Sequence, residues 1–554
     1  MGTHSATAAR VPSRPGTAAS ATATAWIVGV VFAVHLGIAL VVRTHGWDDG
    51  SITLAFARTF ADHGRIALTE HSEQVEGFSS LAWFGWLTLV DLVIPLGFTG
   101  FVLASQISAA VAAAITAAVL YRVLLEVAPH RRTVAVIAAC TLVFGLFLNE
   151  TANGMEMTLL TAVAVVMVRA LQTRRSATLY LGATLVAFIR LEATGYVVIG
   201  ALTLWALNRG AAVTAAKLAA AAVAGAAVTT AVRVLVFGAL VPNTITAKKS
   251  PPYTPADLGA QISGRQFVVV EFIAVFAPAL VLLVFSLVVT GRSRVRDGLR
   301  IDRTDGAAAA FAVGYVVGVV LVNIGLGRNL GYFGRMELSA APLAVFLVVR
   351  AAPDAWITLR GNVRTVVVVV VTLVLSLLTI DTSWVRAVAD PDARPSVTPE
   401  RYRDAGQAFD DFGKAAGLRV VSVFTPDVGG SSLCCRDLRI LDLALLANAE
   451  LADRGYGYTG AYLEKTRPDL IETHAPWTDA SRILDSAVFR DQYRPVSVNG
   501  FAFYARDDLV EKVADRCDMR PASQTRSDVN RGATIDEDHL GNRPVCVLTA
   551  TPRQ

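Results

Sequence analysis

The chain has 554 residues, of which 54% are hydrophobic and 17% are charged, and its formal net charge is +5. A mean hydropathy of +0.50 is too high for a water-soluble protein of this length, so the composition indicates a polytopic membrane protein. The positive charge does not predict a nucleic-acid partner, because Lys and Arg lie in short clusters between apolar runs, as in loops on the inner side of a membrane.

Residues 1–23 are small, polar and basic, which predicts a disordered cytoplasmic tail. The apolar run that follows, 24–43, is about 20 residues long and therefore favours a retained membrane anchor over a cleaved signal peptide.

About twelve apolar runs fill the chain up to residue 380. They lie near residues 24–43, 79–98, 100–124, 133–148, 154–171, 177–190, 192–207, 211–238, 266–290, 307–326, 335–350 and 363–380. If all of them crossed the membrane, the basic connections YRVLLEVAPHRR, LQTRRS and GRSRVRDGLR would lie outside, against the positive-inside rule.

The run 79–98 resolves this conflict if it lies along the outer membrane interface, a position that suits Trp83, Trp86 and Asp91. We therefore predict about eleven transmembrane helices within residues 24–380, with the N-terminus inside. Residues 381–554 then form one extracytoplasmic domain, long enough to have its own core.

Two adjacent acids, Asp48 and Asp49, follow the first apolar run in the segment GWDDG. The next residues, ITLAFARTFADHG, have apolar side chains at helical intervals and predict a short amphipathic helix on the membrane surface. A carboxylate at the N-cap of that helix is favoured by free backbone N–H groups. Capping explains one acid, and the second is a candidate general base or metal ligand, with simple solvation as the alternative.

With this topology, ionisable and amide side chains at the ends of the spans all open outward, which predicts a shared outer cavity. The residues are Asp48, Asp49, Glu76, Glu156, Arg190, Glu192, Asn243, Lys248, Arg328 and Arg335.

Short sequence patches lie along the chain in the order DDGSI, VEGFSSLAW, NGMEMTLL, FIRLEATGY, FGALVPNTITAKK and GRNLGYFGRMELSAAPL. In this order they resemble membrane glycosyltransferases of the GT-C fold. The resemblance covers about residues 24–350 and is closest to the group that includes the actinobacterial terminal β-(1→2)-arabinofuranosyltransferase of cell-wall arabinan. It implies transfer of a sugar from a polyprenyl-phosphate donor, decaprenyl phosphate in that group, to a glycan outside the membrane. It also implies that Asp48 or Asp49 is catalytic.

The outward-facing residues suit that chemistry. A lipid-linked phosphate at the outer interface needs cations, since Arg binds phosphate oxygens bidentately and Lys offers a point charge. A carboxylate stabilises positive charge on the sugar ring and accepts the proton of the acceptor hydroxyl. The residues predicted to contact substrates are Glu76, Glu156, Arg190, Glu192, Asn243, Lys248, Arg328 and Arg335.

Simpler roles for some of these residues stay open. Arg190 and Glu192 are close enough in sequence to pair with each other, and Lys248 is placed to anchor lipid headgroups. Asn243 follows a proline, a position typical of a turn.

His45, His63 and His71 lie in the same loop as the acids, but no HExxH or HxxxH spacing occurs, so the spacing predicts no dedicated zinc site. A divalent cation that bridges the donor phosphate and Asp48 or Asp49 is the alternative. The sequence has no GxxxxGK[ST] or GxGxxG motif, which argues against an ATP-driven pump and a nucleotide-sugar donor. A transporter or flippase of a lipid-linked sugar is the other candidate class, although repeated halves are not evident.

The region from residue 381 alternates predicted helices and strands, which indicates a small α/β domain. A helix is predicted over 400–416, a buried strand over LRVVSVF and a turn at TPDVGG, with further strands in RILDLALLANA and RPDLIETHAPW.

Aromatic residues and cysteines of this region have specific predicted roles. The aromatic side chains that are candidates for stacking on sugars, with core packing as the alternative, are those of Tyr456, Tyr458 and Trp477. A Cys517–Cys546 disulfide would hold the C-terminal tail. Cys434 and Cys435 are adjacent and are predicted to pair with each other, to pair with other cysteines, or to stay reduced.

Overall fold

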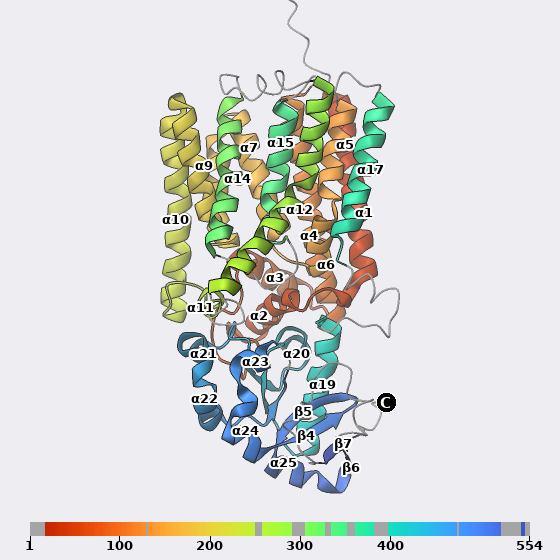
Figure 1. The fold of residues 1–554 in the computed structure, drawn as a ribbon, viewed down its shortest axis with the longest axis vertical. Coiled ribbons are helices and arrows are strands. Elements are labelled where there is room, and N and C mark those ends of the chain that lie inside the picture. The colour runs from red at the N-terminus through yellow and green to blue at the C-terminus, as the bar shows by residue number, and fades with distance from the viewer. Residues whose placement is uncertain are drawn as a thin grey trace, which may run out of the picture.

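The computed structural model describes residues 17–128, 131–249, 258–290, 305–326, 334–351, 361–381, 397–473, 476–521 and 544–548. Long helices stand side by side in one bundle, and a smaller domain of strands and short helices lies against one end of it (Figure 1). Between the two lie α2 (Asp49–His63) and α3 (Leu81–Val93). The polytopic helical architecture and the C-terminal α/β domain that the sequence predicts are both present.

The bundle is built from helices distributed along residues 17–379. They are α1 (Thr17–Val42), α4 (Phe98–Leu125), α5 (Arg131–Leu142), α6 (Gly145–Asn153), α7 (Met157–Gln172), α8 (Ser176–Ile189), α9 (Ala193–Leu207), α10 (Ala212–Phe237), α12 (Leu258–Thr290), α14 (Gly306–Leu326), α15 (Ala341–Ala351) and α17 (Gly361–Thr379). Short helical turns, η1 (Arg43–His45), η2 (Arg209–Ala211), η3 (Leu338–Ala340) and α11 (Asn243–Ala247), join some of them.

The outer surface of the bundle is apolar. Leu235, Val288 and Leu377 are 75–86% exposed, a cost in water that is removed when such side chains contact lipid. Among the described residues, five helices are long and apolar enough to cross a membrane, and a sixth span results if α5 and α6, bent by 48°, count as one. The chain is therefore a multi-pass membrane protein, and the figure of about eleven spans stays a prediction.

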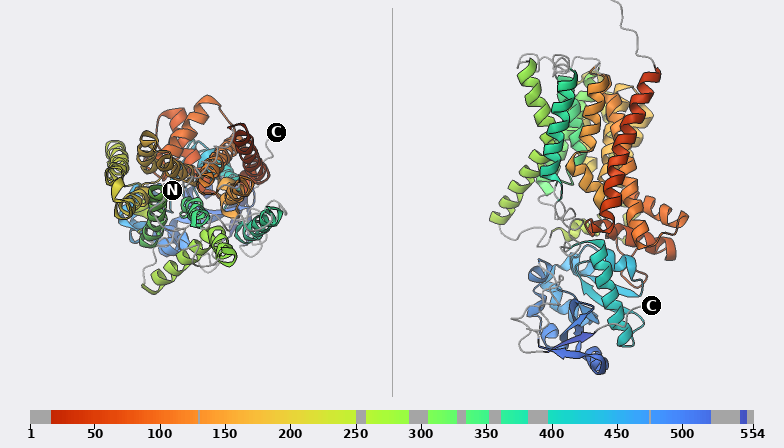
Figure 2. Two further views of the ribbon diagram at one scale, coloured as in Figure 1. Left: turned by 90° about the horizontal axis from the view of Figure 1, so that it is seen from above. Right: turned by 90° about the vertical axis from the view of Figure 1, so that its right-hand side faces the viewer.

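Helix α3, which corresponds to the run 79–98, packs against α2 at the end of the bundle (Figure 2). Arg58 Nη2 of α2 donates to Asp91 Oδ1 of α3 at 2.9 Å, and the rings of Phe60 and Phe84 meet edge to face at 5.6 Å. With 13 residues, α3 is short for a bilayer-crossing helix. The interfacial position of the run stays a prediction, which this length fits.

The C-terminal domain contains a seven-stranded mixed sheet with the order β2-β1-β3-β5-β4-β7-β6. The strands are β1 (Val421–Thr425), β2 (Leu438–Asp442), β3 (Leu470–Ile471), β4 (Tyr493–Val498), β5 (Phe501–Arg506), β6 (Asp518–Arg520) and β7 (Val545–Leu548). The helices and helical turns are α19 (Pro399–Ala415), α20 (Gly429–Cys434), α21 (Ala449–Arg454), η4 (Tyr456–Tyr458), α22 (Thr459–Thr466), α23 (Trp477–Ser481), η5 (Ile483–Asp485), α24 (Ala487–Gln492), α25 (Asp507–Lys512) and η6 (Ala514–Arg516).

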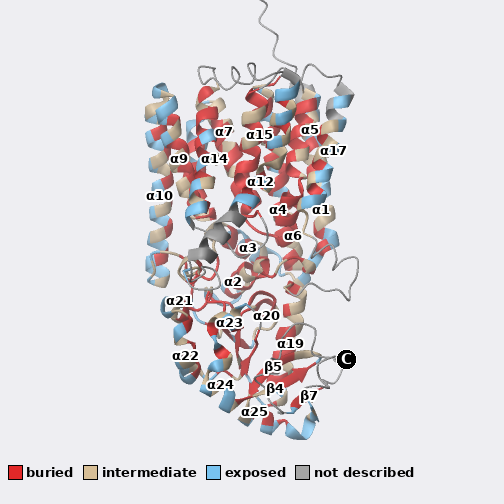
Figure 3. Cartoon of the chain, viewed as in Figure 1, coloured by how far each residue is buried: buried red, intermediate tan, exposed pale blue. Residues whose placement is uncertain are grey.

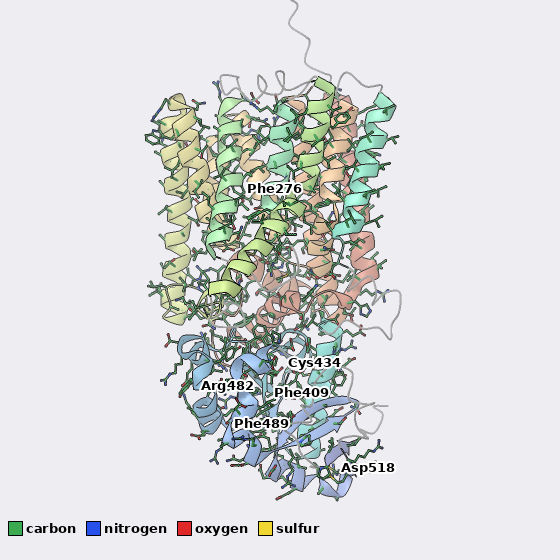
Figure 4. All side chains as sticks on the ribbon, in the orientation of Figure 1. Phe276, Phe409, Cys434, Arg482, Phe489 and Asp518 are labelled. Carbon is green, nitrogen blue, oxygen red and sulfur yellow. A yellow bond between two sulfur atoms is a disulfide. The ribbon has the colours of Figure 1, made fainter. Side chains whose placement is uncertain are left out.

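Helix α19 illustrates how this domain is held together. The ring centroids of its Phe409 and Phe412 lie 5.1 and 5.9 Å from that of Phe503 on β5. Figure 4 shows Phe409 at this helix–sheet interface. The buried core does not stop at the domain edge, since Phe56 of α2 and Val423 of β1 belong to the same hydrophobic cluster. Figure 3 shows buried residues on both sides of the junction. Shared apolar packing therefore holds the C-terminal domain against the bundle.

All cysteines of the C-terminal domain are paired within the described residues. Cys517 and Cys546 form a disulfide that links the segment before β6 to β7. Cys434 and Cys435 form a disulfide with each other at the end of α20, and Figure 4 marks Cys434 in the part of the domain nearest the bundle. Of the arrangements that the sequence leaves open for Cys434 and Cys435, the structure has the vicinal pair.

Candidate functional site

A cavity of about 370 Å³ lies at the junction of the bundle and the C-terminal domain. Three parts of the chain supply its walls: the first loop (residues 46–80), the ends of the bundle helices, and loops of the C-terminal domain. Its polar lining residues include Asp48, Asp49, Ser79, Glu156, Arg190, Thr244, Lys248, Arg335 and Asp427. Apolar and aromatic lining comes from Trp47, Ile52, Phe78, Met155, Val397, Pro426, Val428, Leu446 and Trp477, among others.

Asp48 binds the backbone of the C-terminal domain. Its Oδ2 accepts from the N–H of Gly429 at 2.9 Å and its Oδ1 from the N–H of Gly430 at 2.7 Å. The hydroxyl of Ser51 donates to Oδ1 at 2.6 Å. A Cβ at Gly429 would lie 2.6 Å from Asp48 O, so the close approach depends on glycine. The carboxylate is thus saturated by donors and holds two domains together.

Burial raises the pKa of Asp48 to about 6, because the desolvation of the carboxylate outweighs the hydrogen bonds from Ser51 and the two glycines. The negative charge of neighbouring Asp49 adds to this rise.

Asp49 has a different environment from its neighbour. Its side chain is 38% exposed, and its Oδ2 lies 3.7 Å from Nη1 of Arg335. Burial of the carboxylate within the cavity raises its pKa, while the positive charges of Arg335 and Lys248 oppose the rise. Asp49 is therefore the member of the acidic pair that a bound molecule can reach.

Glu156 brings two arginines to the cavity wall. Its Oε1 accepts from Arg190 Nη1 at 2.7 Å and from Arg335 Nη2 at 3.0 Å. Arg190 Nε also donates to Glu192 Oε1 at 2.6 Å, so the local Arg190–Glu192 pair is present together with the contact to Glu156. Each guanidinium carries five N–H donors, and these carboxylates fix the orientation of both groups.

Lys248 completes the positive wall of the cavity at the end of α11. Burial, together with the neighbouring charges of Arg190 and Arg335, lowers its pKa to about 8. Glu192 and Asp49 act in the opposite direction. An anionic ligand would raise this pKa and keep the ammonium charged.

Other predicted site residues lie away from the cavity surface. Glu76 Oε2 accepts from Nε of Arg233 at 2.7 Å, and both side chains are almost fully buried. Asn243 Nδ2 donates to the carbonyl oxygens of Leu445 and Leu446, each at 2.8 Å, and so joins α11 to the C-terminal domain. Glu192 accepts a hydrogen bond from Arg190 and so holds the guanidinium group in place. Arg328 lies outside the described residues.

The C-terminal domain supplies one cavity residue that the sequence did not predict, Asp427, beside the predicted Trp477. Asp427 lines the cavity, and burial raises its pKa to about 8, although a hydrogen bond with Tyr402 opposes the rise. The acid followed by Val-Gly-Gly in TPDVGG is the only local signal for this position. Trp477 lines the cavity as an aromatic wall.

The two tyrosines predicted to stack on sugars have other contacts. Tyr456 is buried, and its hydroxyl donates to the carbonyl of Leu443 at 2.7 Å. The ring of Tyr458 lies 4.4 Å from the guanidinium carbon of Arg454. Trp477 is therefore the one of the three predicted aromatic residues that is placed to contact a ligand in the cavity.

The acidic pair does not fit a divalent cation. The oxygens of Asp48 already accept from two backbone N–H groups and a hydroxyl. Arg335 and Lys248 already supply positive charge to Asp49, and they would repel a metal ion at that position.

No protein-family model and no curated protein matches the sequence. Solved structures with a similar arrangement were found at low sequence identity. The oligosaccharyltransferase of Archaeoglobus fulgidus in the apo form has 11% identity and a TM-score of 0.49, over 87% of this chain and 74% of that protein. The complex of the Archaeoglobus fulgidus oligosaccharyltransferase AglB with an inhibitory peptide and a dolichol-phosphate has 12% identity and a TM-score of 0.47, over 87% and 74%. ArnT of Cupriavidus metallidurans bound to undecaprenyl phosphate has 12% identity and a TM-score of 0.42, over 81% and 80%. At TM-scores below 0.5, these similarities do not decide the activity of this chain.

Proposed function

We propose that the chain is a membrane glycosyltransferase that moves a sugar from a polyprenyl-phosphate donor to a glycan acceptor on the outer face of the membrane. The observation that carries this proposal is the cavity at the junction, where Asp49 faces a wall formed by Arg190, Lys248 and Arg335. A carboxylate beside several cations suits a reaction in which a hydroxyl loses a proton and a phosphate leaves as an anion.

The cationic wall is suited to the donor. A lipid-linked phosphate stays at the membrane interface because its chain remains in the bilayer, and the cavity lies where the bundle ends. Glu156 holds Arg190 and Arg335 side by side, so that two planar donor groups and the Lys248 ammonium are ready before the donor arrives. Preorganised donors of this kind stabilise a leaving phosphate without a later cost of reorganisation.

Asp49 is the catalytic base of the proposed reaction. Its carboxylate accepts the proton of the acceptor hydroxyl while the hydroxyl oxygen forms a bond to the anomeric carbon of the sugar. The bond between that carbon and the phosphate oxygen breaks, and its electron pair leaves with the lipid phosphate, which Arg335 and Lys248 stabilise. The raised pKa of Asp49 makes the carboxylate a stronger base than a fully solvated aspartate.

The C-terminal domain forms the acceptor side of the cavity in this scheme. Trp477 offers an aromatic face against which a sugar ring packs, and Asp427 offers a carboxyl group that its raised pKa keeps protonated at neutral pH. This assignment places the C-terminal domain in the extracytoplasmic compartment, with residues 1–23 in the cytoplasm.

The sugar that we propose is arabinofuranose carried on decaprenyl phosphate, with cell-wall or lipoglycan arabinan as the acceptor. This choice comes from the ordered patches DDGSI to GRNLGYFGRMELSAAPL. It is separable from the proposal of lipid-linked sugar transfer, because a different sugar would be bound by the same cationic wall.

The test is transfer of label by the purified full-length protein in lipid nanodiscs. Radiolabelled decaprenyl-phosphoryl arabinofuranose and an arabinan oligosaccharide should give a labelled, longer oligosaccharide, whereas a decaprenyl-phosphoryl hexose should not. Label transfer from the hexose donor alone would overturn the arabinose assignment. Movement of labelled donor between the leaflets of vesicles, with no labelled glycan, would overturn the enzyme assignment in favour of a flippase.

Sidedness has its own test. The Glu464→Cys variant places a thiol on an exposed position of α22. A membrane-impermeant maleimide added to intact cells should label it. Labelling only after the membrane is opened would place the C-terminal domain in the cytoplasm and overturn the proposal.

A further inference from the structure

The first loop and the C-terminal domain meet at a second cluster of ligating side chains. Among the described residues, one ligand atom each from Glu70, His71 and Asp437 lie within 4.8 Å of one another. His71 Nε2 lies 3.1 Å from Glu70 Oε1, and His63 Nδ1 lies 3.4 Å from Glu70 Oε2. One imidazole and two carboxylates thus gather at one place, with His63 beside Glu70 at its edge, separate from the lining of the cavity.

The backbone on both sides of this cluster is fixed. Thr69 Oγ1 donates to the carbonyl of Leu438 at 2.6 Å. The N–H of Ile440 donates to Ser72 Oγ at 3.0 Å. Thr69 and Ser72 flank Glu70 and His71, while Leu438 follows Asp437, so these bonds hold the two segments in register where the ligating side chains meet.

Two nearby arginines bind neutral oxygens and not the carboxylates of the cluster. Arg65 donates to the carbonyl oxygens of Glu70 and Ser72. Arg436 Nη2 donates to Thr59 Oγ1 at 2.7 Å, and its positive charge acts on Glu70. The positive charge of Arg436 weakens the electrostatic attraction between the carboxylates and a cation. A cation at the cluster must therefore be held by direct bonds to its ligand atoms.

We propose that Glu70, His71 and Asp437 bind a Zn²⁺ ion that fastens the first loop to the C-terminal domain. Nitrogen and carboxylate oxygen ligands suit Zn²⁺, and a water molecule would complete the coordination of a site with three protein ligands. The sequence spacing of the histidines does not predict this site, because Asp437, which completes it, comes from a distant part of the chain.

The ion would stabilise the wall of the cavity. The first loop continues from the cluster to Gly77, Phe78 and Ser79, which line the cavity. Asp437 directly precedes β2, and β1 and β2 are paired along their length. Fastening the loop to β2 therefore limits how far the cavity wall moves from the C-terminal domain. This role does not depend on which reaction occurs in the cavity.

The test measures metal binding by the full-length protein, purified with an affinity tag that contains no histidine and then stripped with a chelator. Isothermal titration with ZnCl₂ should show one Zn²⁺ per chain, and added Zn²⁺ should raise the thermal unfolding temperature. The His71→Ala and Asp437→Asn variants should each lose affinity by more than the roughly 10- to 100-fold that loss of an outer-shell partner costs.

The matched control is His45→Ala. His45 lies at the same junction and pairs with Glu400 at 3.4 Å, away from the cluster, so this variant should bind Zn²⁺ as the unmodified chain does. Asp437 is exposed, so Asp437→Asn decides the question even if His71→Ala fails to fold. The proposal is overturned if the unmodified chain binds no Zn²⁺, or if Asp437→Asn binds it with unchanged affinity.

Cobalt substitution identifies the donor atoms. Co²⁺ bound by imidazole and carboxylate gives visible absorption without an intense thiolate charge-transfer band. The free cysteine of the described residues is Cys140. A thiolate band that disappears in the Cys140→Ser variant would place the ion elsewhere and overturn the proposal.

Discussion

The Asp49→Asn substitution separates the proposed chemistry from the fold. Asparagine keeps the size of the side chain and removes only its charge and its ability to accept a proton. The lost contact with Arg335 spans 3.7 Å at a side chain that is 38% exposed, and an ion pair of this kind contributes about 0–1 kcal/mol. Removal of the charge also removes the cost of desolvating a partly buried carboxylate, which raises stability and so opposes the loss of the ion pair. The variant should therefore unfold within a few degrees of the unmodified protein.

The effect on the rate should be far larger. Removal of a general base costs about 10²- to 10⁴-fold in the chemical step, and Arg190, Lys248 and Arg335 remain in place to bind the donor phosphate. We expect kcat for glycosyl transfer to fall by this factor in Asp49→Asn, with little change in the affinity for the lipid-linked donor.

The matched control is the same substitution at the adjacent position. In Asp48→Asn, one amide N–H₂ faces the N–H of Gly429 or Gly430, so the docking of α20 changes while Asp49 is left intact. Transfer by this variant should exceed that by Asp49→Asn by at least about tenfold. Label transfer at saturating donor, together with thermal unfolding of both variants, measures the difference. An active Asp49→Asn beside an inactive, folded Asp48→Asn would refute the division of roles.

Other perturbations test the contacts around the cavity. Glu76→Ala should lower the free energy of unfolding by about 3–5 kcal/mol, because Arg233 is left as a buried, uncompensated charge; adding Arg233→Met should restore most of it in thermal unfolding. The folded-state pKa of Asp48 is raised from 3.8 to about 6, so folding favours the protonated carboxyl group. This preference contributes about 3 kcal/mol to stability, which is fully present below pH 3.8 and lost as the pH rises through 6. The difference between the unfolding temperatures of the unmodified chain and Asp48→Asn should therefore narrow or change sign over that interval. With a pKa of about 8, Asp427 is protonated at pH 7, so Asp427→Asn should keep most of its transfer rate there. Above pH 8 this variant should show a smaller decline in rate than the unmodified protein, and the decline that remains comes from Lys248, whose pKa is also about 8.

The membrane architecture could be predicted because its signals are local. Hydropathy within about 20 residues reports burial in lipid. The side of the membrane on which each loop lies, which rests on the position of Lys and Arg, stays a prediction. The run 79–98 could be set apart because Trp83, Trp86 and Asp91 do not suit a lipid-facing helix, and α3 indeed packs with α2.

The C-terminal domain also carries local sequence signals for its elements. The β4–β5 hairpin turns at Asn499 and Gly500, whose φ angles are 52° and 81°. Asn-Gly between two apolar segments is a strong hairpin signal, since both turn residues tolerate positive φ. The predicted helix at 400–416 and the strand at LRVVSVF correspond closely to α19 and β1, because both have clear apolar periodicity.

The site could be predicted only in part because its contacts are long-range. Ionisable residues at span ends are conspicuous, and Asp49, Glu156, Arg190, Lys248 and Arg335 do line one cavity. Glu76 and Asn243 are equally conspicuous in sequence, but their partners come from α10 and the C-terminal domain. Charge and position alone do not tell a buried ion pair from a ligand contact.

The division of labour between Asp48 and Asp49 follows from helix geometry. Both residues stand at the start of α2, where successive side chains point about 100° apart around the axis. The two carboxylates therefore cannot both face the same partner. One reaches the backbone of α20 and the other reaches the cavity, so a single turn of backbone both docks the C-terminal domain and places an acid beside the cations. Loss of that docking would move Asp427 and Trp477, which line the same cavity, away from Asp49, so the hydrogen bonds of Asp48 position the acceptor side of the cavity relative to the proposed base.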